Sequence, residues 1–458
     1  MTPDDATATT ASPDTLVTVV GLDAAGGPPH PALAPALTGA GLVVGAARHL
    51  AAVPVPASAQ TVVLGPLAPA LRRLVDAIAT GVPAVVLASG DPGLFGIVRR
   101  LRAAGLPLRV VPAVSSVAAA FARAGLSWDG AAVVTAHGRD LRPALNACRA
   151  LPLVAVLTAP GAGAAELGAG LVGWPRRLLV AEHLGTDAER VHAVTPAQAA
   201  TDTWPDPHVL LSIAEPPPAP PASIVPTAEP LPVPLASAAT SVSAATPVTV
   251  VPAAPAPDPF AVGGMRVDNQ PAAAPAGGWA LPENRYAHRD SMITKSEVRA
   301  LVVARLRPRL GRLVWDVGAG SGSVGIECAL LGAAVLAVEQ DPASAATIRD
   351  NAATHAVDVR VVVGRAPAAL DGLPEPDAVF VGGGGVDVLA AVLTRRPARV
   401  VLTLAALDRV APAVHLLRAA GYSVEGSQLA AARLADLPGG SIRLAATNPV
   451  VVLTGERP

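Results

Sequence analysis

Two stretches of the chain alternate short apolar runs with amphipathic segments, and the stretch between them lacks that pattern. In the first stretch, apolar runs bounded by Gly, Pro or Asp are predicted β-strands: Leu16–Gly21, Leu42–Gly45, Ala84–Ala88, Arg109–Val111, Ala132–Thr135, Leu153–Thr158, Leu178–Ala181 and His208–Ile213. Helical periodicity lies between several of them: Ala68–Thr80, Gly96–Ala104 and Ser116–Ala124. This alternation predicts an α/β domain with a largely parallel sheet over residues 14–214.

The pattern disappears between residues 215 and 278. Pro, Ala, Val, Ser and Thr dominate this segment, and three prolines open it at 216–218. Such a composition favours extended, polyproline-like conformations and cannot build a packed core. Because the segment is also too long for an ordinary loop, we predict a disordered Pro/Ala-rich linker there. We also predict a disordered N-terminus at 1–13.

The alternation returns from residue 279 to residue 458. A helix is expected from about Lys295 to Leu306, followed by an apolar run that begins at Leu313. Later strands are predicted at Val335–Glu339, Val359–Val363, Ala378–Gly382, Arg399–Leu404, Tyr422–Leu429 and Val450–Leu453. The sequence therefore predicts a second α/β domain.

The second domain is organised around Leu313–Gly325, which is typical of a buried strand, a tight turn and a helix start. The turn carries Gly318, Gly320 and Gly322, which permit positive φ and close backbone approach to a ligand. About twenty residues on, a strand ends in Glu339, whose carboxylate can accept hydrogen bonds from ribose hydroxyls. A dinucleotide fingerprint would have glycine at Ser323. The alternative is a structural strand–helix turn in another kind of α/β domain.

Composition narrows the function classes. Hydrophobic residues make up 51% of the chain and charged residues 15%, and the formal net charge of −1 predicts neither nucleic-acid nor anionic-membrane binding. Cys148 and Cys328 lie far apart without metal-ligand spacing, so neither a disulfide framework nor a metal site is expected. No apolar run reaches about 18 residues, and the polar start lacks signal-peptide features. We therefore expect a cytoplasmic protein.

Two polar turns follow predicted strands in the first domain. Ser89–Gly96 contains a Gly-Asp-Pro turn, and Pro112–Val117 places Ser115 and Ser116 at a helix start. Ligands of open α/β sheets bind at the carboxyl ends of parallel strands, where both turns are expected. For the serines, simple capping of the helix is the alternative interpretation.

These turns belong to a set of segments that resembles the tetrapyrrole (corrin/porphyrin) methylase family over about 16–214. The other matching segments are Val19–Gly21, Gly45–Leu50, Thr135–Arg139 and Ala181–Gly185. The match is most similar to C5-methylating domains that act on precorrin-6Y. It implies a two-subdomain α/β fold that holds S-adenosylmethionine (SAM) between the subdomains, through Gly21, Gly90, Asp91, Leu94, Ser115, Ser116 and Thr158.

One position departs from that family. The family's first loop reads Val-Gly-x-Gly, whereas this chain has Gly21-Leu22-Asp23. An acidic side chain in place of a glycine would crowd the cleft or alter substrate entry. A non-catalytic tetrapyrrole-binding module is therefore an open alternative for this half.

The second domain resembles Rossmann-like class I SAM methyltransferases that methylate C15 of a corrin precursor and decarboxylate it. The glycine turn carries this resemblance together with the segments Leu281–Asp290 and Met292–Arg299. Further matches are Val363–Pro367, Asp377–Gly385 and Thr447–Val450. The resemblance implies that SAM is held by Thr294, Gly318, Ala319, Gly320, Ser321, Gly322, Glu339 and Ala366. From the residues alone, Thr294 with Glu297 three positions later predicts a capping box.

The loop after the fourth strand of this domain is Gly382–Gly385. Methylation of amino groups on bases uses an Asn-Pro-Pro-aromatic motif at this position, so its absence counts against a nucleic-acid N-methyltransferase. A glycine run would instead let a flat macrocycle approach the backbone closely.

In this order, the two halves resemble precorrin-6Y C5,15-methyltransferases (decarboxylating). The resemblance implies SAM-dependent methylation of a precorrin-6 type tetrapyrrole at C5 and C15, decarboxylation of its C12 acetate side chain, no metal cofactor and a homo-oligomer. Such a tetrapyrrole carries carboxylates, which cationic side chains can bind. The candidates for this role are Arg285, Arg289, Arg299, Arg433 and His137. Solvated surface charge is the alternative for each. A different pair of SAM-dependent transferases is the competing enzyme class.

Overall fold

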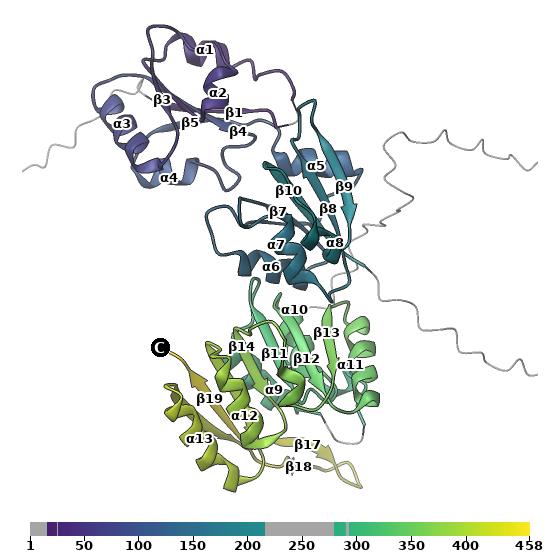
Figure 1. Cartoon of the computed structure of the whole chain (residues 1–458). Helices are drawn as coiled ribbons and strands as arrows, with labels where there is room; N and C mark the ends of the chain where they lie inside the picture. Colours follow the sequence, from purple (N-terminus) through teal and green to yellow (C-terminus); the bar gives the residue numbers. More distant parts are fainter. Residues whose placement is uncertain (1–15, 25, 216–278, 290–292) are drawn as a thin grey trace, which may run out of the picture.

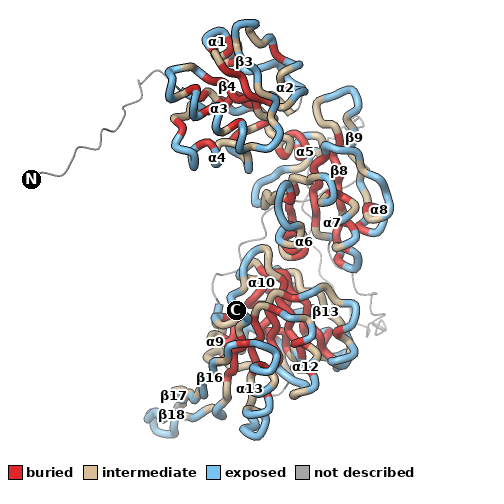
Figure 2. The backbone as a smooth tube through the Cα atoms, turned by 60° about the vertical axis from the view of Figure 1, so that its left-hand side comes forward, coloured by how far each residue is buried: buried red, intermediate tan, exposed pale blue. Residues whose placement is uncertain are grey.

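The computed structural model describes residues 16–24, 26–215, 279–289 and 293–458. The predicted disordered N-terminus and nearly all of the predicted linker lie outside the described residues. Figures 1 and 2 show three α/β units in a row, the second lying between the first and the third.

The first unit is a five-stranded parallel sheet in the order β3-β2-β4-β1-β5. Its elements are β1 (Val17–Leu22), α1 (Leu33–Thr38), β2 (Leu42–Gly45), α2 (Ala47–Ala51), β3 (Gln60–Val63), α3 (Leu67–Ala79), β4 (Ala84–Ser89), α4 (Val98–Ala103) and β5 (Leu108–Val111). The sequence did not predict β3, an edge strand with mostly exposed side chains and hence no apolar run.

The second unit is a mixed sheet in the order β6-β7-β10-β8-β9, in which only β6 and β7 are parallel. Its elements are α5 (Ser116–Ala124), β6 (Ala132–Thr135), α6 (Leu141–Ala150), β7 (Leu153–Leu157), α7 (Ala164–Leu171), β8 (Arg176–Glu182), β9 (Arg190–Val194), α8 (Pro196–Thr201) and β10 (His208–Ala214). The prediction of a largely parallel sheet is wrong here. The loop between β8 and β9 is too short for a parallel crossover, so the chain folds back as a hairpin.

The third unit has a seven-stranded sheet in the order β13-β12-β11-β14-β15-β19-β16, with β19 antiparallel to its neighbours. Its helices are α9 (Ser296–Leu306), α10 (Ser323–Leu330), α11 (Pro342–Thr354), α12 (Gly385–Thr394) and α13 (Val410–Ala419), with short 3₁₀ turns η1 (Glu283–Arg285), η2 (Ala368–Leu370) and η3 (Leu407–Arg409). Its strands are β11 (Leu313–Val317), β12 (Ala334–Glu339), β13 (Val359–Val363), β14 (Ala378–Val381), β15 (Arg399–Leu404), β16 (Ser423–Leu429), β17 (Ala432–Asp436), β18 (Ile442–Ala446) and β19 (Val450–Glu456). This confirms the predicted class I methyltransferase architecture.

The central strands of this sheet are buried on both faces, as the continuous apolar runs predicted. Residues of α12 and α13 pack in one core cluster, and residues of α9 and α10 pack in another. Figure 2 shows the buried positions concentrated along these strands. The β17–β18 hairpin was not predicted, because it pairs only with itself and exposes its apolar residues, such as Leu434 and Leu444.

Candidate functional site

The glycine turn after β11 has the conformation that its sequence requires. Gly318, Gly320 and Gly322 have φ values of +73°, +57° and +75°, in the left-handed region. A Cβ at Gly318 would lie 3.0 Å from the backbone nitrogen of Gly383, in the glycine loop after β14. The turn and the Gly382–Gly385 loop therefore lie against each other at the carboxyl edge of the sheet.

Glu339 ends β12 beside this turn. One of its carboxylate oxygens accepts a hydrogen bond from the N–H of Gly320 at 2.8 Å, and the other accepts from the N–H of Asp341 at 3.0 Å. Each oxygen keeps a second lone pair. The predicted residues Gly318–Gly322 and Glu339 are thus brought together at one edge of the sheet. Ala366 lies beyond β13 and packs partly buried against the core cluster that includes Val338.

Asp316 lies beneath the turn and is completely buried. Its Oδ2 accepts from the N–H of Gly325 at 2.8 Å, while its Oδ1 has no hydrogen-bond partner among the described residues. Burial, with a smaller contribution from the negative charge of Glu339, raises the pKa of Asp316 to about 7. This carboxyl group therefore changes protonation state near neutral pH.

The predicted capping box at Thr294 is wrong. Helix α9 begins at Ser296 with Lys295 at the N-cap, and the N–H of Ser296 donates to the carboxylate of Glu283 at 2.9 Å, not to Thr294. The carboxylate of Glu297 turns instead to the guanidinium of Arg433, because a charge-assisted pair is stronger than a neutral cap. Thr294 stays beside the cavity described below, and its carbonyl accepts from Arg299 at 2.6 Å.

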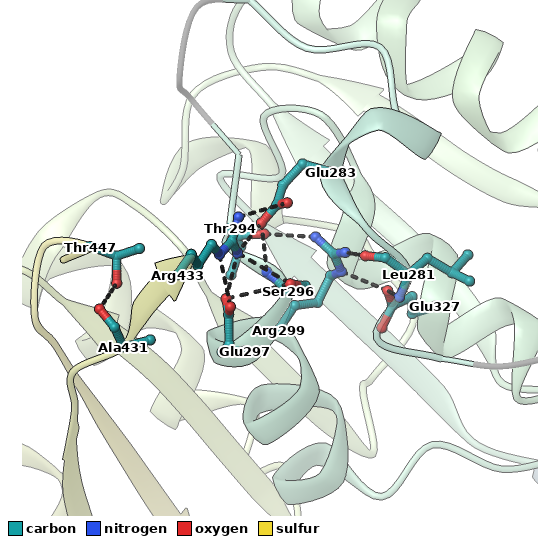
Figure 3. Close-up of polar contacts among 10 residues, drawn as sticks. All are labelled: Leu281, Glu283, Thr294, Ser296, Glu297, Arg299, Glu327, Ala431, Arg433 and Thr447. Carbon is teal, nitrogen blue, oxygen red and sulfur yellow. Dashed lines mark hydrogen bonds and ion pairs between the residues drawn. The ribbon is translucent and has the colours of Figure 1, made fainter. Parts of the chain in front are cut away.

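Arg299 is a structural residue, which corrects its prediction as a substrate clamp. Its side chain is fully buried and pairs with Glu327 of α10, also fully buried, at 2.6 Å. Its two terminal nitrogens donate to the carbonyls of Thr294 and Leu281 (Figure 3). No exposed surface of the guanidinium is left for a substrate carboxylate.

The side chains of Glu327 and Asn351 hold the segment before α9 against the glycine turn and the helix that follows it. Glu327 accepts from the N–H groups of Ala280 and Leu281 and from the hydroxyl of Tyr286, at 2.9, 3.0 and 3.2 Å. The side chain of Asn351 bonds to both backbone groups of Ala287 and donates to the carbonyl of Ser321 at 2.9 Å. These contacts fix the segment that precedes Thr294 relative to the glycine turn.

Arg433 of β17 is also committed to acidic partners. It lies 2.7 Å from Glu283 and 2.5 Å from Glu297, and it bonds to the hydroxyl of Ser296 at 3.2 Å (Figure 3). Hydrogen bonding to Arg433 lowers the pKa of Glu283 to about 2 and also lowers the pKa of Glu297. A substrate carboxylate would have to displace one of these partners, so Arg433 is a poor clamp and a good anchor for the hairpin.

The remaining predicted clamps are exposed. Arg289 lies 3.8 Å from Asp341, and neither it nor Arg285 is among the residues that line the cavity. His137 lies in the second unit on an exposed turn, far along the chain from this site.

A cavity of about 830 Å³ opens beside the glycine loop after β14. Lys295, the single lysine of the chain, and Arg409 of η3 supply its unpaired cations: within the described residues neither side chain has an ion-pair partner. The other lining residues used below are Thr294, Gly382–Gly385, Leu389, Thr403, Thr447 and Asn448. Sequence reasoning missed Lys295, Arg409 and Asn448, which come from three distant segments. The available signals were the rarity of lysine and the positions of Lys295 and Asn448 within the matching segments Met292–Arg299 and Thr447–Val450.

In the amino-terminal half, the predicted turns meet at the carboxyl edge of the first sheet. A Cβ at Gly21 would collide with the carbonyl of Gly90, and a Cβ at Gly90 would lie 2.9 Å from the Cα of Ser115. The hydroxyl of Ser115 accepts from the N–H of Ala118 at 3.1 Å, so the capping interpretation of this serine is confirmed. Ser116 is the first residue of α5, next to it.

Among the other predicted residues of this half, Leu94 links the two subdomains, whereas the described contacts of Asp91 and Thr158 stay within one subdomain. Asp91 accepts from the N–H of Gly93 at 2.8 Å, and Leu94 packs against the core of the second unit. Thr158 follows β7 and donates its hydroxyl to the carbonyl of His208. The carboxylate of Asp23 lies where a Cβ at Gly27 would stand, so it is turned toward the next part of its own loop.

Replacing Glu327 with alanine tests the buried pair. The change leaves a buried guanidinium without a counter-charge, so we expect a loss of about 3–5 kcal/mol in the free energy of unfolding, measured by urea denaturation of the full chain. The matched control is Glu425→Ala, whose pair with Arg305 is largely exposed, with an expected change below about 1 kcal/mol. Equal effects would contradict the role assigned to the pair.

Asp316→Asn tests the raised pKa. A folded-state pKa of about 7 against an unfolded value of about 4 means that folded Asp316 holds its proton longer, so the wild type loses stability as pH rises through this window. The asparagine variant should lose less. We expect its thermal unfolding midpoint to fall less than that of the wild type between pH ~5 and ~8. Parallel profiles for the two proteins would refute the prediction.

Comparison with known proteins agrees with this geometry. Residues 32–200 match the family of Tetrapyrrole (Corrin/Porphyrin) Methylases, and residues 284–453 match the Precorrin methyltransferase domain. The chain is 36% identical over 332 residues to a precorrin-6Y C(5,15)-methyltransferase [decarboxylating] of Sinorhizobium sp, covering 70% of this chain and 67% of that protein.

Two shorter proteins match the carboxy-terminal half. A probable cobalt-precorrin-6B C(15)-methyltransferase (decarboxylating) of Pyrobaculum calidifontis is 34% identical, covering 38% of this chain and 94% of that protein. A solved structure of a precorrin-6y C5,15-methyltransferase from Geobacter metallireducens is 35% identical, covering 39% of this chain and 97% of that chain with a TM-score of 0.37. With its Sinorhizobium relative matched across both halves, this chain belongs to the family of decarboxylating precorrin-6Y C5,15-methyltransferases.

Proposed function

We propose that this protein methylates a precorrin-6 type tetrapyrrole at C5 and C15 and decarboxylates its C12 acetate side chain, with SAM as the methyl donor, in the biosynthesis of the cobalamin ring. The observation that carries the proposal for the carboxy-terminal half is the cavity of about 830 Å³, which adjoins the cofactor turn through the Gly382–Gly385 loop. A cavity of this size is within the range of small-molecule sites.

The residues of the glycine turn fit SAM. Glu339 would accept hydrogen bonds from the ribose hydroxyls, and the turn at Gly318–Gly322 lets the backbone approach the cofactor without Cβ collisions. Thr294, which lines the cavity and whose backbone Arg299 holds, would border the methionine portion. When bound, SAM supplies an electrophilic methyl group on its sulfonium.

The macrocycle would occupy the cavity with its ring over the glycine loop. The absence of side chains at Gly382–Gly385 permits a flat ring to lie close to the backbone. Lys295 and Arg409 would pair with carboxylates at the ring's edge, and Thr403, Thr447 and Asn448 offer neutral polar groups. Arg285 and Arg289, which do not line the cavity, are weaker candidates for this task.

For the methyl transfer, the main task of the protein is to position the substrate and the methyl donor. A reduced tetrapyrrole carries electron-rich bridging carbons that are already nucleophilic, so the site has to align that carbon with the methyl group and exclude water. No strong base is required for this step. On loss of carbon dioxide, the electron pair of the broken C–C bond would pass into the adjacent electron-accepting ring of the substrate, and a proton from solvent would complete the new methyl group.

For the amino-terminal half, the proposal places C5 methylation beside the turns that meet at Gly21, Gly90 and Ser115. These positions are close enough that a Cβ at either glycine would collide or crowd. The competing interpretation, a half that binds tetrapyrrole without methylating it, rests on Asp23 in place of a family glycine.

The function is tested by mass spectrometry of a reduced precorrin-6 substrate after incubation with the purified chain and SAM. We expect a gain of two methyl groups and a loss of one carbon dioxide. One methyl group with decarboxylation would mean that only the carboxy-terminal half is catalytic. An unchanged substrate in the presence of bound SAM would refute the substrate assignment.

Lys295→Gln and Arg409→Gln test the proposed carboxylate contacts. Each removes one charge-assisted hydrogen bond, worth about 1.5–3 kcal/mol, so we expect KM for the tetrapyrrole to rise roughly tenfold or more while SAM affinity stays unchanged. Arg285→Gln, an exposed cation outside the cavity lining, is the control and should change neither. Equal KM values for all three variants would contradict this substrate position.

A further inference from the structure

The second and third units meet along an interface that has no part in either candidate site. Asn146 of α6 donates to the carbonyl of Gly311 at 3.2 Å, and Arg142 donates to the carbonyl of Glu375 at 2.7 Å. Ala150, the last residue of α6, packs against the core of the third unit. The two units therefore share packed as well as polar contacts.

An ion pair and an aromatic ring strengthen this interface. Arg176, whose side chain is fully buried, lies 2.6 Å from Asp358 of the third unit. The ring of Trp174 lies 5.5 Å from the guanidinium of Arg149 and 5.7 Å from that of Arg360, which comes from the third unit. Loss of these contacts with Arg176 still buried would leave its charge uncompensated, which is costly, so the contacts favour this arrangement of the two units.

Two strands begin at this interface and end at the two candidate sites. In the third unit, β11 follows Gly311 and runs away from the interface into the glycine turn. In the second unit, β7 follows α6 and ends at Leu157, which packs in the same core cluster as Leu94 of the Gly-Asp-Pro turn. Figure 1 shows the consequence: α6 and α7 lie against one end of the third unit, and the β17–β18 hairpin, which contacts α9, lies at the other.

The separation of the sites follows from the strands. Five residues of extended chain span roughly 15 Å, so β7 and β11 together put the candidate sites on the order of 30 Å apart. The residues between them are packed core: both strands are buried over nearly their whole length. A macrocycle with several carboxylates cannot cross a packed core of this kind.

We propose that the two sites of one chain work as separate reactors, so that the singly methylated tetrapyrrole is released to solvent and rebinds before the second methylation. This inference rests on the proposed function. Its basis is that β7 and β11 both lead away from the shared interface, so the candidate residues at their carboxyl ends lie at opposite ends of the two packed units.

A mixing experiment tests the inference. One variant is disabled in the amino-terminal half by Gly90→Val, and the other in the carboxy-terminal half by Glu339→Ala. A double change, Ser115→Ala with Ser116→Ala, serves if Gly90→Val does not fold. Each variant alone must fail to make the doubly methylated product, and the wild type must make it.

The product of the mixed variants is followed by mass spectrometry at several dilutions. We expect doubly methylated, decarboxylated product after a lag, at a rate that falls as the mixture is diluted, because the intermediate travels through solvent. No such product from the mixture would overturn the proposal, and so would a rate per enzyme that is independent of dilution, which means transfer within a stable assembly. A wild type that adds no methyl group would refute the proposed function instead.

Discussion

The buried carboxylate of Glu327 is the contact on which the carboxy-terminal site depends. It belongs to α10, the helix that starts at the glycine turn, and it accepts hydrogen bonds from the segment that leads into α9. Arg299 completes the arrangement by neutralising this charge and by holding the carbonyl of Thr294. One desolvated ion pair thus fixes the position of the glycine turn relative to the wall of the cavity beside Gly382–Gly385.

Burial decided how much of the fold could be predicted. Strands such as β11 and β12, covered on both faces, produce uninterrupted apolar runs that predict their positions to within a residue or two. The edge strand β3 and the β17–β18 hairpin expose most of their side chains and carry no such signal. The direction of β10 is set by its neighbours in the sheet, and a local pattern does not contain that information.

In the candidate site, the sequence predicts where the backbone needs glycine, but it does not predict which charged side chains pair with one another. Glycines 318, 320 and 322 are needed locally, for positive φ, so the sequence predicts them. The role of an arginine depends on which carboxylates the fold brings to it: Arg299 and Arg433 meet Glu327, Glu283 and Glu297, from other elements. Among the residues that the structure describes, no carboxylate pairs with Lys295 or Arg409, and both line the cavity, which is visible only once α9 and η3 are placed.

The contact between the second and third units is largely polar, built from Asn146, Arg142, Arg176 and their partners. Separated from the other, each half would present a face rich in charges that water can hydrate, and not a broad apolar patch prone to aggregation. A relative that matches over 184 residues, 94% of its own length, is about the size of one half alone.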